Sequence, residues 1–201
     1  MTGASAVFLD KDGTLIDDIA YNVDPRRIKL APGAAEGLYL LVRRGYRLIV
    51  VSNQPGVALG IFPEHALRTV EARLRELLHD VGVPLAGFHY CPHLPAGMVA
   101  EYAVPCTCRK PASGLLSHAA REHGVDLESS WMVGDILDDI EAGRGAGCGT
   151  VLIDNGNETE WDLTPERRPD KVAADLFEAA ALIVSTDTRP GPALVPSCGY
   201  A

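Results

Sequence analysis

The chain lacks a run of apolar residues long enough for a membrane-spanning helix, which needs about 20 of them. It also lacks an excess of basic residues, because 18 Lys and Arg stand against 27 Asp and Glu. The resulting net charge of −9 disfavours broad binding to nucleic acid or to an anionic membrane. Residues 1–6 contain no basic region followed by an apolar run, so we expect no signal peptide and a cytoplasmic protein.

Five cysteines are present, and without an export signal they favour metal binding over a disulfide framework. Cys91, His93, Cys106 and Cys108 lie within one loop, residues 91–108. Three thiolates and an imidazole suit tetrahedral Zn²⁺ and leave no open position, so we predict a structural zinc site. The alternative is a set of ordinary thiols in a loop. Of the two other cysteines, we expect Cys148 to be a packed thiol and Cys198 a tail residue.

Short apolar runs alternate with stretches of helical periodicity along most of the chain. The expected strands are residues 6–9, 47–51, 88–90, 131–133 and 150–153, with 171–173 at an edge, and the expected helices are 32–44, 63–80, 113–122, 138–144 and 175–183. This alternation predicts an α/β fold, a doubly wound parallel sheet with helices on both faces. We expect one domain over residues 1–184, a flexible tail over 185–201, and three long insertions, 12–30, 54–62 and 92–105, each after a strand.

Two carboxylates, Asp10 and Asp12, follow the first strand directly. Side chains at positions i and i+2 of an extended chain point the same way, so both acids can face one site. Two carboxylates aimed together repel unless a cation or a shared proton holds them, and Mg²⁺ prefers such oxygen ligands. Taken alone, the segment is better explained as a polar turn, because Asp and Gly are common turn residues.

Polar residues also follow the other strands. They are Ser52, Asn53, Gln54, Arg109, Lys110, Asp135, Asp138 and Asp139. Ligands of open α/β sheets bind beyond the carboxyl ends of the strands, so these residues predict one site. Phosphoryl transfer is the chemistry that needs such a set: a carboxylate nucleophile, a Mg²⁺ ion, a lysine and a hydroxyl to balance the phosphoryl charge, and an acid/base.

The segments DKDGT, Ser52-Asn53, Lys110-Pro111 and GDILDD occur in the order and at the spacing of the four motifs of the haloacid dehalogenase (HAD) superfamily, which the chain therefore resembles. The resemblance implies that Asp10 is the nucleophile and Asp12 the general acid/base. It implies that Ser52 and Lys110 bind the phosphoryl group. Asp10, Asp135 and the backbone carbonyl of Asp12 would hold Mg²⁺, with Asp138 or Asp139 behind them.

The zinc loop, DKDGTL and SNQPGV resemble the heptose 1,7-bisphosphate 7-phosphatases, which are HAD phosphatases without a separate cap domain. The resemblance implies that the substrate-binding residues are Asp18, Tyr21, Ser52, Asn53, Gln54, Arg109 and Lys110. Arg109 would recognise the second phosphate. Ile136 stands where these enzymes commonly carry a lysine, which leaves the exact sugar and its anomer open.

Three alternatives stay open at this point. Histidinol-phosphate phosphatases share the zinc loop. A receiver-like phosphoacceptor module also uses acids, a hydroxyl and a lysine, although an acid/base at Asp12 would shorten the life of an aspartyl-phosphate. The third alternative is an inactive zinc-stabilised scaffold. With no cap and no exposed apolar stripe in the sequence, we expect a monomer whose partner is a small phosphorylated sugar.

Overall fold

The computed structural model describes residues 3–187, so Cys198 and residues 188–201 of the predicted tail lie outside the described residues. Six parallel strands form one sheet in the order β3-β2-β1-β4-β5-β6. The strands are β1 (Ala6–Leu9), β2 (Arg47–Asn53), β3 (Gly87–Cys91), β4 (Trp131–Gly134), β5 (Gly149–Ile153) and β6 (Lys171–Ala173). The order reverses direction between β1 and β4, which places the ligand crevice of a doubly wound sheet beside these two strands.

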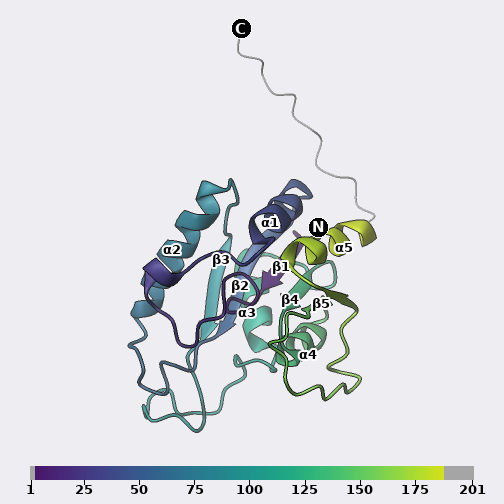
Figure 1. Ribbon diagram of the computed structural model, residues 1–201. Helices are drawn as coiled ribbons and strands as arrows, with labels where there is room; N and C mark the ends of the chain where they lie inside the picture. The colour runs from purple at the N-terminus through teal and green to yellow at the C-terminus, as the bar shows by residue number, and fades with distance from the viewer. Residues whose placement is uncertain (1–2, 188–201) are drawn as a thin grey trace.

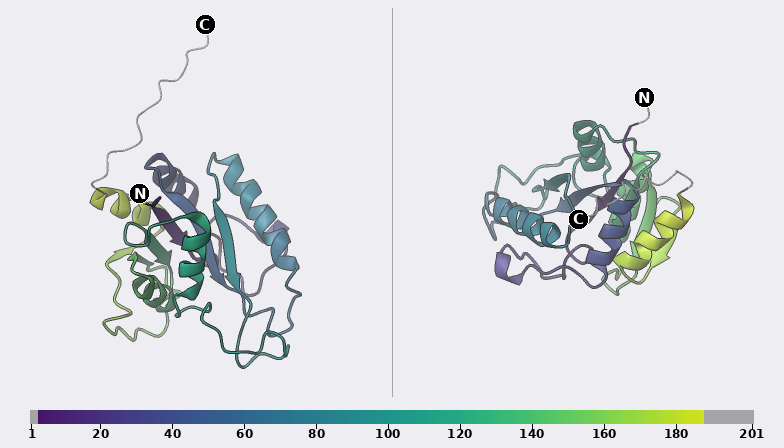
Figure 2. Two further views of the ribbon diagram at one scale, coloured as in Figure 1. Left: turned by 180° about the vertical axis from the view of Figure 1, so that it is seen from behind. Right: turned by 90° about the horizontal axis from the view of Figure 1, so that it is seen from above.

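Five α-helices cover the two faces of this sheet. They are α1 (Ala34–Arg43), α2 (Ala66–Asp80), α3 (Gly114–His123), α4 (Leu137–Ala146) and α5 (Leu176–Thr186), and a 3-10 helix spans Pro25–Arg27. Figure 2 shows α1, α2 and α5 on one face of the sheet and α3 on the opposite face. The predicted doubly wound architecture is therefore confirmed.

The two faces of β1 explain this layering. Val7 and Leu9 pack in the core cluster that includes helices α1, α2 and α5, whereas Ala6 and Phe8 pack in the cluster formed with α3. Successive side chains of a strand point to opposite faces, so a strand covered on both sides must be apolar throughout. All four residues of β1 are fully buried, and the Asp that follows them stands at the edge of the sheet.

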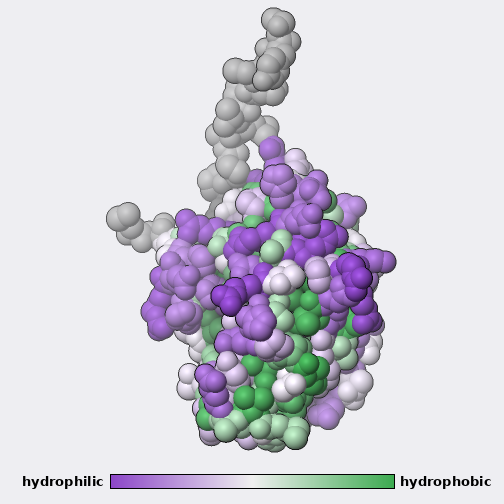
Figure 3. Space-filling model, turned by 90° about the vertical axis from the view of Figure 1, so that its left-hand side faces the viewer, coloured by the Kyte–Doolittle hydropathy of each residue, from purple (hydrophilic) through white to green (hydrophobic). Residues whose placement is uncertain are grey.

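The loops that follow β2 and β3 lie side by side at the lower end of the molecule in Figure 1, where the backbone nitrogens of Met98 and Val99 donate to the carbonyl oxygen of Ala58 over 2.8 and 2.9 Å. Figure 3 shows apolar surface gathered at this end of one face. Ile61 and Met98, in these two loops, are exposed large apolar residues. The monomer was predicted from the lack of an exposed apolar stripe, and these exposed apolar residues remove that support.

Two predictions of chain organisation are wrong in detail. A fourth long connection, residues 154–170, follows β5 and was not expected. Helix α5 continues to Thr186, so Ser185 and Thr186 belong to a helix rather than to a flexible tail. No helix within residues 3–187 is long and apolar enough to cross a lipid bilayer.

Candidate active site

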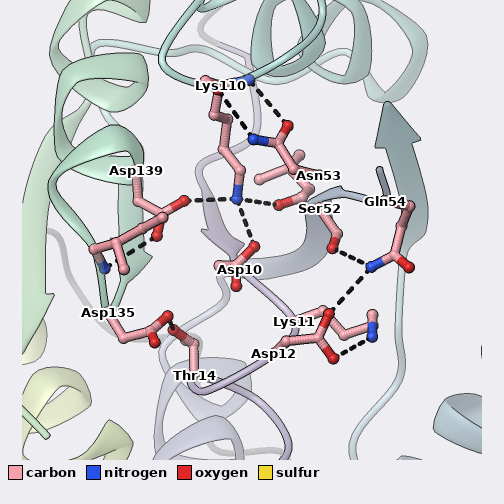
Figure 4. Close-up of polar contacts among 12 residues, drawn as sticks. Asp10, Lys11, Asp12, Thr14, Ser52, Asn53, Gln54, Lys110, Asp135 and Asp139 are labelled. Atoms are coloured by element: carbon pink, nitrogen blue, oxygen red, sulfur yellow. Dashed lines mark hydrogen bonds and ion pairs between the residues drawn. The ribbon is translucent and has the colours of Figure 1, made fainter. Parts of the chain in front are cut away.

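Asp10 is the first residue of the loop that follows β1. Its backbone nitrogen donates to the carbonyl oxygen of Val133 on β4 over 2.9 Å, which extends the sheet by one residue and fixes the start of the loop. Its carboxylate is mostly buried, and the Oδ1 atom lies 2.5 Å from the Lys110 ammonium group (Figure 4). Within the described residues, no hydrogen bond to Oδ2 is formed, so this oxygen is the one available to a ligand.

Lys110 is the central cation of this site. Its Nζ atom lies 2.5 Å from Asp10 Oδ1 and 2.6 Å from Asp139 Oδ1, and it donates to the carbonyl oxygen of Val51 over 2.9 Å (Figure 4). The side chain is almost completely buried. Burial alone would lower the pKa of Lys110, but Asp10 and Asp139 outweigh it and raise the pKa. The lysine is therefore charged and held in one position.

Asn53, at the end of β2, holds the backbone of Lys110. Its Nδ2 atom donates to the Lys110 carbonyl oxygen and its Oδ1 atom accepts from the Lys110 amide, each over 3.0 Å. Both polar atoms of the Asn53 side chain thus bind the loop that carries the lysine. A residue predicted from sequence to contact substrate has a positioning role in this structure.

Asp12 lies on the more open side of the site. Its Oδ2 atom accepts from Gln54 Nε2 over 3.1 Å, and the same nitrogen donates to Ser52 Oγ over 2.9 Å. The buried ammonium group of Lys11 forms an ion pair with Asp12 Oδ1. Burial, partly offset by Lys11, raises the pKa of Asp12, which favours a carboxyl group that can hold a proton.

Asp135, at the end of β4, faces Asp10 across the crevice. Thr14 Oγ1 donates to its Oδ1 atom over 2.9 Å, and Asn157 Nδ2 donates to its Oδ2 atom over 2.7 Å. Burial, together with repulsion from Asp10, raises the pKa of Asp135 to about 6. These two donors orient the carboxylate but do not neutralise it.

The structure separates the two candidate acids of the fourth motif. Asp139 is fully buried and pairs with Lys110, and burial raises its pKa to about 7 despite that lysine. Asp138 points to the other side of α4 and pairs with Arg167 over 2.7 Å. Of these two acids, Asp139 is therefore the one that lies in the site with Asp10 and Asp135.

The unexpected loop 154–170 supplies contacts that the sequence interpretation missed. Besides the bond from Asn157, Asn155 Nδ2 donates to the carbonyl oxygen of Gly13 over 2.7 Å, and Glu158 Oε2 accepts from the backbone nitrogen of Leu137 over 2.6 Å. The signal was available, because the segment DNGNE follows a strand as directly as the other site residues do.

At Gly13 the loop after β1 lies very close to Asp135 and to loop 154–170. Its φ of +81° lies in the left-handed region that favours glycine. A Cβ atom on this residue would lie 2.2 Å from Asp135 Oδ2 and 2.4 Å from Asn157 Nδ2. Any side chain here would therefore displace the carboxylate or the loop.

The donor set fits a divalent cation. Carboxylate oxygens of Asp10, Asp135 and Asp139 lie within 4.8 Å of one another. Lys110 is the only ammonium group paired with them within the described residues, so it balances one of three negative charges. Burial, together with repulsion from Asp10, raises the pKa values of Asp135 and Asp139, and oxygen-only ligands suit Mg²⁺.

The predicted zinc ligands come together as one cluster. Cys91 Sγ lies 3.0 Å from Cys108 Sγ, 3.6 Å from Cys106 Sγ and 3.6 Å from His93 Nδ1. Ligands that surround a Zn²⁺ ion tetrahedrally at 2.0–2.3 Å lie on the order of 3.3–3.8 Å apart. Two of these three separations lie in that range and the Cys91–Cys108 separation is shorter, so the four atoms are close enough to surround one ion after a small outward movement of one thiol.

The remaining predicted residues are not members of the carboxylate cluster. Asp18 and Tyr21 are exposed on the loop after β1, with Tyr21 at a φ of +54°. Arg109 precedes Lys110, and its Nη1 atom is buried without a hydrogen-bond partner among residues 3–187.

Residues 107–179 match the HAD-hydrolase-like family. A D-glycero-beta-D-manno-heptose-1,7-bisphosphate 7-phosphatase of Photorhabdus laumondii is 40% identical over 77% of this chain and 82% of its own length. The enzyme of that name from Pasteurella multocida is 41% identical over 78% of this chain and 85% of its own length.

A solved structure extends the similarity to three dimensions. It is the D,D-heptose 1,7-bisphosphate phosphatase of B. bronchiseptica complexed with magnesium and phosphate. It superposes with a TM-score of 0.74 at 26% identity, covering 91% of this chain and 99% of that one. Fold and sequence thus point to the same group of enzymes.

Proposed function

Because this chain belongs to the D-glycero-beta-D-manno-heptose-1,7-bisphosphate 7-phosphatase family of HAD-like hydrolases, we propose the following mechanism for its site. The chain is a phosphoric monoester hydrolase whose substrate is the heptose 1,7-bisphosphate, cleaved at the 7-phosphate. The names of the relatives favour the β-anomer. They also decide against a phosphoacceptor module and against an inactive scaffold.

Asp10 is the nucleophile of this mechanism. The observation that carries this assignment is the contact between its Oδ1 atom and the buried Lys110 ammonium group, which leaves Oδ2 available for attack. Lys110 and the Ser52 hydroxyl balance the charge on the phosphoryl oxygens. Asp139 and Asn53 hold Lys110 in place from two sides.

Asp12 is the general acid and base of this mechanism. Its raised pKa suits a carboxyl group that protonates the departing sugar oxygen as the bond from Asp10 to phosphorus forms. The resulting carboxylate then takes a proton from the water that hydrolyses the aspartyl-phosphate. Phosphate leaves, and Asp10 and Asp12 return to their starting states. Gln54 links Asp12 to Ser52 and so keeps both at one side of the phosphoryl group.

Asp10, Asp135 and the backbone carbonyl of Asp12 would hold Mg²⁺. When bound, the ion neutralises the carboxylates and polarises the phosphoryl oxygen. Asp139 does not need to be a ligand, because its Oδ1 atom already pairs with Lys110. Thr14 and Asn157 hold the Asp135 carboxylate in place and would position it as a ligand.

Asn157→Ala is expected to raise the Mg²⁺ concentration for half-maximal activity by about tenfold, because it removes a donor that orients a metal ligand. A magnesium titration of phosphate release measures this effect. Glu160→Gln, an exposed change in the same loop, is the matched control and should titrate as the wild type does. Identical titrations for both variants would show that Asn157 does not support magnesium binding.

Arg109 and the residues Asp18, Tyr21 and Gln54 complete the proposed substrate site. The Arg109 Nη1 atom is buried and has no hydrogen-bond partner within residues 3–187, which supports a role in binding the second phosphate. Cys91, His93, Cys106 and Cys108 would hold a structural Zn²⁺, which would restrain the loop leading to Arg109. The cytoplasmic location and the monomeric state stay predictions.

Substrate choice is tested by the turnover of a panel with Mg²⁺. The panel contains both anomers of the heptose 1,7-bisphosphate, fructose 1,6-bisphosphate and histidinol phosphate. We expect the highest kcat/KM for the β-anomer, by about tenfold or more over the α-anomer, as one well-placed contact is worth on the order of 1.4 kcal/mol. A preference for histidinol phosphate would contradict the substrate assignment but would not affect the mechanism proposed for Asp10.

A further inference from the structure

A third cluster of potential metal-binding side chains shares no residue with the two sites described above. It consists of His89 on β3 and of Glu122 and His123 at the C-terminal end of α3. One ligand atom from each residue lies within 4.8 Å of the others. The phosphatase mechanism uses none of them, and the Cys/His cluster has its own four ligands.

The geometry of this cluster suits one small ion. His89 Nε2 and His123 Nε2 lie 3.0 Å apart, and His123 Nε2 lies 4.0 Å from Glu122 Oε1. Nitrogen and oxygen ligands of a tetrahedral ion at about 2.0–2.1 Å lie on the order of 3.3 Å apart. Small side-chain adjustments therefore suffice to place all three atoms around one ion.

His118 supports the arrangement from one turn earlier on α3. Its Nε2 atom lies 3.5 Å from Glu122 Oε2, the carboxylate oxygen that does not face His123. A carboxylate held by an imidazole on one oxygen presents the other in a fixed direction, as supporting residues do for metal ligands. His118 is thus a positioning residue.

Gly87 is the feature that lets the two imidazoles meet. It lies two residues before His89 on β3, so both residues face the same side of the strand. A Cβ atom on Gly87 would lie 2.4 Å from His123 Nε2 and 3.0 Å from His89 Nε2. The space between β3 and α3 is therefore shaped around these two nitrogen atoms.

We propose that His89, Glu122 and His123 bind one divalent transition-metal ion of the class that prefers imidazole, represented by Zn²⁺, Co²⁺ and Ni²⁺. The fourth position is open to water. The ion ties the end of α3 to the edge strand β3. These two elements enclose the segment with the Cys/His cluster and Lys110, so the ion closes that segment as a loop and restrains it.

The test is a Co²⁺ titration of the zinc-loaded protein in a large excess of Mg²⁺, which keeps the carboxylate site of Asp10 and Asp135 filled. Binding is followed by visible absorption and calorimetry at a pH above the imidazole pKa. We expect one equivalent of Co²⁺ to bind with d–d absorption bands and without a thiolate-to-cobalt band, because the site contains nitrogen and oxygen ligands only. Thermal unfolding should shift upward with Co²⁺, since the ion binds the folded state.

His123→Ala and Gly87→Ala should each weaken Co²⁺ binding by at least about tenfold, the first by removing a ligand and the second by filling its space. His79→Ala is the matched control, because the His79 side chain is 91% exposed on α2, outside the cluster, and this variant should bind as the wild type does. Zinc content and phosphatase kcat verify that each variant is folded.

Three results would overturn the proposal. The first is the absence of a bound equivalent in the wild type, which would leave His89 and His123 as a hydrogen-bonded pair. The second is equal binding by His123→Ala and His79→Ala. The third is a thiolate-to-cobalt band, which would place the ion in the Cys/His cluster.

Discussion

Asp10→Asn is expected to lower kcat by more than about 10⁴-fold, the scale of losing a nucleophile, with the fold unchanged. The amide has nearly the shape of the carboxylate and its oxygen can still accept from Lys110, but it cannot form an acyl-phosphate. The buried Lys110 keeps Asp139 as a partner in the variant. The loss should therefore fall on chemistry rather than on stability.

Phosphate release in the steady state measures the loss, and near-ultraviolet circular dichroism with thermal unfolding checks the fold. Asp138→Asn is the matched control, because Asp138 pairs with Arg167 on the other side of α4 and should keep most of the activity. Retained turnover in Asp10→Asn would exclude Asp10 as the nucleophile.

Removal of zinc is expected to lower stability by at least about 4 kcal/mol, the linkage free energy of a site held at a thousand times its dissociation constant. For a domain of this length, that corresponds to a fall of about 10 °C in Tm. Activity should fall too, because residues 91–108 lead directly to Arg109 and Lys110. Burial raises the pKa of the Cys91 thiol, so zinc must displace its proton and should bind more tightly as pH rises.

The Cys108→Ser variant tests the structural role of zinc without a chelator, which would also remove Mg²⁺. We expect about one zinc per chain in the wild type and little in this variant, with a lower Tm. Cys148→Ala is the matched control, because Cys148 is a buried free thiol outside the cluster and the variant should keep its zinc. A zinc-free protein with full activity and an unchanged Tm would contradict the structural role.

Several elements were predictable because their signal is local. The strand at residues 6–9 and the edge strand at 171–173 have the observed bounds, since each is a short β-favouring run between polar or turn segments. Helices were predicted in the right places but with ends displaced by up to three residues, as at Ala66. Helix ends depend on capping contacts that periodicity does not register.

The grouping of Asp10, Asp12, Ser52, Lys110 and Asp135 at one edge was also predictable, because parallel strands deliver their carboxyl ends to the same place. Loop 154–170 was missed although it follows the same rule. It has no helical or strand periodicity, and its asparagines gain importance only by reaching Gly13 and Asp135 across the sheet.

The amino-acid sequence by itself determined which polar residues follow the strands, the family, the two acids that follow β1 and the four residues of the Cys/His cluster. Each depends on residue type and spacing along the chain. Only the tertiary structure decided that Asp139 rather than Asp138 faces Lys110, and that Asn53 holds the lysine backbone. Those roles depend on which side of a helix or loop meets another segment, and that is set by packing between residues far apart in the sequence.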